Sequence, residues 1–160
     1  MPGEHRLYEE IEVTVSGFFT THHRFATEAG VRGEFTFPAF ASYASFRTTG
    51  GRELVMKKVH WLGSAHELSD GEMVRGTADR RSLFGREIAI SYGGRRYLLV
   101  PAGFLSQDWY LTDDEGTRLV ELQPRGILNQ GFFLMTAVPL DVELLAFAYY
   151  LVHVRRQEDS

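Results

Sequence analysis

The sequence predicts a mainly β domain that ends in a helix buried on every side. Three observations support this fold class. A strand, a glycine-containing turn, a basic residue and a second strand recur three times in order. Aromatic residues make up 13% of the chain, with 12 Phe and 7 Tyr, which favours strands and a well-filled core. The last apolar segment has no polar face. A length of 160 residues suits one domain, with its core at about 10–155.

The first part of the chain contains short strand candidates. Residues 10–16 alternate polar and apolar side chains, which is typical of a half-buried strand. Residues 20–24 are polar and are interpreted as a turn. Two further short strands are expected at 35–37 and 42–48, separated by Pro38.

Three hairpins are expected later in the chain. Their glycines supply the positive φ that tight turns require. Three hairpins in a chain of this size favour a meander sheet that curls into a barrel or a sandwich. A last strand is expected at 131–137. The hairpins comprise 45–47, 49–52 and 54–56; 88–92, 93–96 and 97–100; and 109–111, 113–116 and 118–122.

The terminal helix has recognisable ends. Pro139 stops the preceding strand, and Asp141 is a favourable N-cap residue. Glu143 in the first turn and Arg155 and Arg156 in the last turn suit the helix dipole. The polar tail at 155–160 is expected to fray.

This helix is predicted to be a core element. Between 142 and 154 only Glu143 and His153 are neither apolar nor aromatic, whereas a surface helix keeps a polar face. His153 is interpreted as a hydrogen-bonded core histidine. A helix of about 15 residues is about 22 Å long, enough to thread a small barrel. The residues expected to form the core helix are Asp141, Leu144, Leu145, Phe147, Ala148, Leu151 and Val152.

Composition narrows the possible functions. The formal net charge is −4, which argues against broad nucleic-acid binding. Cysteine is absent, so disulfides and thiolate metal sites are excluded. The longest apolar run, 144–152, is too short to span a membrane, and the N-terminus has no apolar signal segment. We expect a cytoplasmic protein, peripheral to the membrane if it meets one, whose oligomeric state the sequence does not give.

No catalytic or cofactor signature is present. The chain has no Gly-x-Ser-x-Gly elbow, Walker A loop or Gly-x-Gly-x-x-Gly fingerprint. His22 and His23 are the only histidine pair, and a metal site would need further ligands. We therefore predict no metal or cofactor and favour a binding domain over an enzyme.

Basic residues are the candidate ligand site. Residues 52–97 contain nine Lys or Arg against six Asp or Glu, and arginine forks suit phosphate. If these side chains converge, they would bind an anion such as a phospholipid or phosphoinositide headgroup. The alternative is a solvated charged surface with scattered partners. The candidates are Lys57, Lys58, Arg75, Arg80, Arg81, Arg86, Arg95 and Arg96.

The Gly-turn hairpins, Phe132-Phe133-Leu134 and the segment 139–146 resemble the tubby C-terminal-like family. This family includes the LURP-one-related proteins and the phospholipid scramblases. Asp141-Val142-Glu143-Leu144-Leu145 is similar to the opening of the family's core helix, and the resemblance covers about 30–155.

The resemblance implies a closed antiparallel barrel of about twelve strands around a central C-terminal helix. It also implies a non-enzymatic domain that binds anionic lipid or a protein partner. The chain lacks the scramblases' cysteines, Pro-rich N-terminal region and acidic calcium-binding run, so scramblase activity is poorly supported. A calycin-like carrier of a small ligand, or an enzyme of unknown class, are the alternatives.

Overall fold

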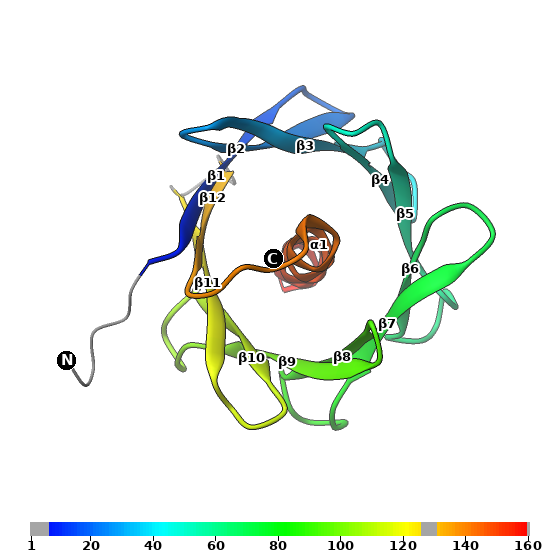
Figure 1. Cartoon of the computed structure of the whole chain (residues 1–160). Coiled ribbons are helices and arrows are strands. Elements are labelled where there is room, and N and C mark those ends of the chain that lie inside the picture. Colours follow the sequence, from blue (N-terminus) through cyan, green and yellow to red (C-terminus); the bar gives the residue numbers. More distant parts are fainter. Residues whose placement is uncertain (1–6, 126–130, 160) are drawn as a thin grey trace.

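The computed structural model describes residues 7–125 and 131–159, which form one closed barrel and one helix. Twelve antiparallel strands surround helix α1 (Figure 1). The strands are β1 (Glu9–Ser16), β2 (Thr21–Thr27), β3 (Gly30–Phe37), β4 (Tyr43–Thr48), β5 (Glu53–Lys58), β6 (His66–Ser69), β7 (Val74–Arg80), β8 (Ile88–Tyr92), β9 (Arg95–Pro101), β10 (Trp109–Asp113), β11 (Arg118–Pro124) and β12 (Gly131–Thr136).

The barrel is an up-and-down meander. Each strand pairs with its neighbours in sequence, and β1 pairs with β12 to close the sheet, with Ile11 opposite Leu134. The three predicted hairpins are present as β4–β5, β8–β9 and β10–β11. Gly93 and Gly94, with φ of 59° and 76°, make the two-residue turn between β8 and β9.

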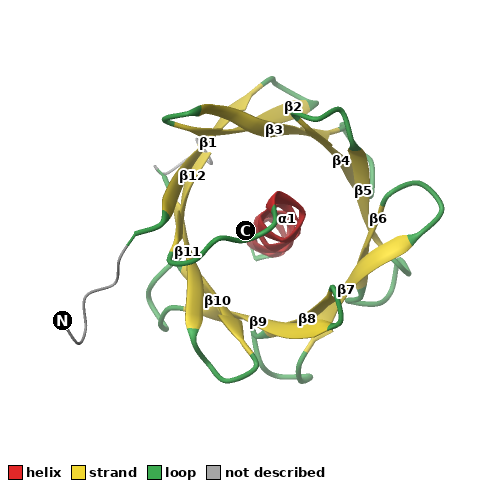
Figure 2. Ribbon diagram, in the orientation of Figure 1, coloured by secondary structure: helices red, strands yellow, loops and turns green. Residues whose placement is uncertain are grey.

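Helix α1 (Val142–Glu158) lies on the barrel axis, as Figure 2 shows. All residues from Glu143 to His153 are buried. Each turn of the helix therefore faces the inner wall, which contributes alternate residues of the strands to a single core. The predicted core helix is confirmed, and its axial position leaves no open interior of the kind a calycin-like carrier needs.

Asp141 occupies the N-cap position, but its side chain does not cap the helix. Its carboxylate instead lies 3.3 Å from the Tyr92 hydroxyl. The backbone amide of Leu145 donates to the Asp141 carbonyl and starts the helical pattern.

Three sequence predictions need correction. Residues 21–24 belong to strand β2 and not to a turn, because His23 is buried as an inward-facing strand residue. Strands β6 and β7 are not among the predicted strands, since of their inward residues His66, Leu68, Gly76 and Ala78 only Leu68 is a large apolar one. The helix continues through 155–158, where fraying was expected.

The meander gives the barrel two different ends. At the loop end lie the connections β1–β2, β3–β4, β5–β6, β7–β8 and β9–β10, which span 17–20, 38–42, 59–65, 81–87 and 102–108. At the turn end lie the shorter connections and the start of α1. The helix runs from the turn end to the loop end, because β12 arrives at the turn end.

Candidate functional site

The predicted basic pairs do not act as pairs, because adjacent residues of a strand point to opposite faces. Lys57 points outward and lies 3.6 Å from Glu67 on β6. Lys58 follows the inward positions of Leu54 and Met56, and it lies at the loop end beside α1.

The second pair is divided in the same way. Arg80 lies at the inward position after Gly76 and Ala78 on β7. Arg81 begins the β7–β8 connection and donates to Glu87 at 2.8 Å.

Arg86 does not join Lys58 and Arg80 in a common pocket. Its guanidinium lies 5.4 Å from the centre of the Trp109 ring and 3.7 Å from the Asp159 carboxylate. Arg86 therefore ties the β7–β8 connection to the barrel wall and to the end of α1.

Three other predicted residues lie at the turn end. Arg75 donates from Nε to Glu143 at 3.0 Å and lies 3.3 Å from Asp70. Arg95 pairs with Tyr92, whereas Arg80 pairs with Ile88, four residues away on the same strand. Arg95 and Arg80 are therefore about 13 Å apart along the direction of the strands. The eight predicted residues therefore do not form one site.

A smaller group does converge at the loop end. Lys58, Arg80 and Arg155 line a pocket of about 380 Å³ between the barrel wall and the end of α1. We call this cavity the rim pocket. Its wall is completed by Leu62, Gly63, Ser64, His66, Ile88, Leu151, Val154 and Glu158.

The cations of the rim pocket are weakly neutralised. Within the described residues, neither Lys58 nor Arg80 makes an ion pair through its side chain. Arg155 lies 3.6 Å from Asp159, but its buried Nε has no hydrogen-bond partner. Glu158 is the one carboxylate in the lining. A buried donor without a partner costs stability unless a ligand or water accepts its hydrogen bond.

His66 forms the inner wall of the rim pocket and carries no charge at neutral pH. Burial, and then the charge of Lys58, lower its pKa to about 4. Its Nδ1 is hydrogen-bonded to the Tyr150 hydroxyl at 2.9 Å. His66 can therefore offer a neutral polar group to a ligand beside the two strand cations.

A separate ionic cluster holds the start of α1. The Glu143 side chain is buried and accepts hydrogen bonds from Arg52, from Arg75 and, at 3.0 Å, from the Tyr92 hydroxyl. Its partners satisfy the carboxylate, so this cluster anchors the helix at the turn end.

The histidine pair is divided between outside and inside. His22 lies 3.6 Å from Glu34 on the outer wall. His23 is buried, and its Nδ1 is hydrogen-bonded to the Tyr149 hydroxyl at 2.5 Å. His153 is also buried, and its ring contacts those of His23 and Tyr149. Within the described ranges, no three His, Asp or Glu side chains lie close enough together to hold a metal.

Sequence analysis missed Arg155, His66 and the exposed loop tips as functional candidates. Arg155 was interpreted only through the helix dipole, and His66 follows a segment in which no strand was expected. Trp109 is buried, whereas Trp61 is 83% exposed at the loop end. The sequence feature that could have indicated the exposed loop tips is the presence of apolar residues inside loops that contain Gly or Pro.

Comparisons with protein-family models, curated proteins and solved structures return no match. The resemblance to the tubby C-terminal-like family therefore stays a prediction. No helix among the described residues is long and apolar enough to cross a membrane.

Proposed function

We propose that this domain is a non-enzymatic binding module for phosphate-bearing anions, the class that includes anionic lipid headgroups. The observation that carries the proposal is the convergence of Lys58, Arg80 and Arg155 on the rim pocket from two strands and the helix. Lysine and arginine are the usual donors to phosphate oxygens, and hydrogen bonds of this kind are strong because both partners are charged.

The polar groups of the rim pocket favour binding over catalysis. The Ser64 hydroxyl donates to Asp79 at 2.5 Å, while His66 is bonded to Tyr150. Ser64 is hydrogen-bonded to Asp79 and not to His66, so the serine and the histidine of the pocket do not form a nucleophile–base pair. The cations, in contrast, are available to a ligand.

The proposal is tested with a soluble probe, inositol hexakisphosphate, and isothermal titration calorimetry. The double variant Lys58→Gln/Arg80→Gln removes two charge-assisted contacts and is expected to bind at least about tenfold more weakly. The matched control is Arg95→Gln/Arg96→Gln, which removes the same charge from the turn end and should bind like the wild type. Equal loss in both variants, or no binding by the wild type, would refute a phosphate site in the rim pocket.

A further inference from the structure

The loop tips carry an unusual ring of exposed apolar side chains. Every described connection at the loop end presents at least one large apolar residue that is 69% exposed or more. Among the described connections of the turn end, Met73 is the one comparable residue. We call the ring the apolar crown. It consists of Phe18, Phe19, Phe40, Trp61, Leu62, Leu83, Phe84, Phe104 and Leu105.

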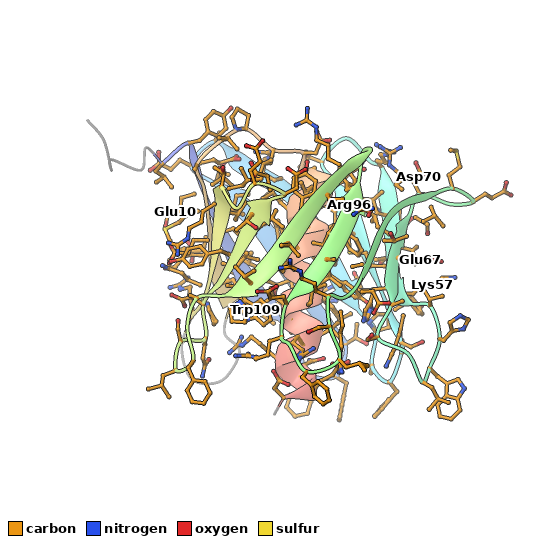
Figure 3. The ribbon with its side chains drawn as sticks, turned by 90° about the horizontal axis from the view of Figure 1, so that it is seen from below. Glu10, Lys57, Glu67, Asp70, Arg96 and Trp109 are labelled. Carbon is orange, nitrogen blue, oxygen red and sulfur yellow. The ribbon has the colours of Figure 1, made fainter. Side chains whose placement is uncertain are left out.

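The crown residues lie at one end because the meander returns to that end after every second strand. The outer wall between the two ends is lined by polar residues such as Glu12, Arg24 and Lys57. In Figure 3 the loop end faces down, and aromatic side chains project beyond the strands around the end of α1. The exposed apolar surface therefore forms a ring around the barrel axis and not a stripe along its wall.

The side chains of the crown do not shield one another from solvent. The rings of Phe18 and Phe19 meet at 4.9 Å, and those of Phe19 and Phe40 lie 6.5 Å apart. Even so, Phe40 is 99% exposed, and its φ of 61° lies in a region that disfavours bulky side chains. A solvated phenylalanine adds no buried apolar surface to the core, and backbone strain of this kind is typical of functional sites.

The distribution of charge indicates what covers the crown. The connections of the turn end carry six acidic residues and one arginine: Glu28, Asp70, Glu72, Asp114, Glu115, Asp141 and Arg52. The five described connections of the loop end carry two arginines and two acidic residues: Arg81, Arg86, Glu87 and Asp108. Strand and helix side chains add three cations and one carboxylate at each end: Lys58, Arg80, Arg155 and Glu158 at the loop end, and Arg75, Arg95, Arg96 and Glu143 at the turn end. The end that is apolar at its tips is thus the more basic one.

We propose that the loop end docks on an anionic lipid bilayer, with the apolar crown inserted at the headgroup level and a lipid phosphate held in the rim pocket. The identity of the lipid rests on the proposed function, whereas the docking itself rests on the crown. Apolar and aromatic side chains beside basic groups are the combination that binds anionic membrane surfaces. The barrel axis is then roughly perpendicular to the plane of the membrane, and the acidic turn end points away from the membrane.

Vesicle flotation tests the docking. Wild-type protein should float with phosphatidylcholine–phosphatidylserine vesicles, and Phe84→Ser/Phe104→Ser should bind at least about tenfold more weakly because two inserted rings are lost. Met73→Ser, at the turn end, is the matched control and should float like the wild type. Vesicle binding by the Phe84→Ser/Phe104→Ser variant equal to that of the wild type would overturn the proposal.

The same variants separate this inference from the proposed function. The Phe84→Ser/Phe104→Ser variant should keep its affinity for inositol hexakisphosphate, since neither ring lines the rim pocket. That result also shows that the variant is folded. If the wild type instead self-associates through the crown, seen in sedimentation velocity as a dimer that these substitutions dissolve, and does not float, then a second copy covers the crown and the membrane proposal is wrong.

Discussion

His23 is a buried polar residue whose environment makes stability depend on pH. Burial lowers its pKa from 6.5 to about 3, and the charges of His153 and His22 add to the effect. The hydrogen bonds to Tyr149 at 2.5 Å and Thr21 at 2.9 Å use both ring nitrogens. The folded protein therefore holds His23 neutral in a range where the unfolded chain is already protonated.

The pH dependence follows from this difference. Between pH 6.5 and about 3 the unfolded state binds a proton at His23 that the folded state does not, so stability falls as the pH falls. Above pH 6.5 His23 is neutral in both states and does not lower the free energy of unfolding. By pH 4 its protonation in the unfolded state lowers the free energy of unfolding by up to about 3 kcal/mol. Urea unfolding as a function of pH should show this loss.

Substitution of the two neighbouring histidines isolates the effect. His23→Gln keeps a polar group near Tyr149 but cannot titrate, so the dependence of stability on pH should become flatter. His22→Gln, on the outer wall, removes only the smallest of the three causes that lower the pKa of His23, so most of the pH dependence should remain. An unchanged slope in His23→Gln would show that burial of this imidazole does not control stability.

Some strands could be predicted from their sequences and others could not. In β8, Ile88, Ile90 and Tyr92 alternate with outward residues, and the following glycines mark the turn, so the hairpin could be predicted. In β7 the inward positions are Gly76 and Ala78, small residues that leave space for Phe147 of the helix. Their packing depends on a residue far away in sequence, which a local pattern does not contain.

The buried position of helix α1 could be predicted from its composition. An apolar helix without a polar face has to be buried, and the described barrel buries it on all sides. A charge placed in the middle of this helix, away from the Glu143 cluster and from the rim pocket, would have no partner inside the barrel and would remove a large part of the domain's usual margin of stability.

Leu145→Asp should therefore abolish folding. Leu145 is 1% exposed on the barrel axis and does not line the rim pocket. Circular dichroism and thermal unfolding should show no cooperative transition in this variant. Leu83→Asp is the matched control, because its side chain is 83% exposed in the crown and the fold should survive. A cooperative transition in Leu145→Asp would mean that the helix is not the centre of the core.

The site was less predictable than the fold. The sequence pointed to lysine and arginine, but strand alternation assigns Lys57 outward and Lys58 inward, and the meander carries Arg95 and Arg96 to the opposite end from Arg80. The partner that completes the rim pocket, Arg155, lies nearly a hundred residues from Lys58 in sequence. Closure of the barrel around α1 is what brings them together.

At the scale of the whole molecule, the protein is polarised along its axis. The apolar crown and the rim pocket share the loop end, and the connections of the turn end are mainly acidic. A molecule polarised in this way has a preferred orientation at a negatively charged surface, because attraction at one end and repulsion at the other act together. Docking through the loop end, as proposed above, places the protein in this orientation.

Quenching of tryptophan fluorescence by brominated lipids reports whether the loop end enters the bilayer. The chain has two tryptophans, of which Trp61 is exposed in the crown and Trp109 is buried in the barrel wall. Vesicles of phosphatidylserine with brominated acyl chains should quench the emission of the wild type but not that of Trp61→Phe, which retains Trp109. Absence of quenching in wild-type protein that is bound to these vesicles would contradict docking through the loop end.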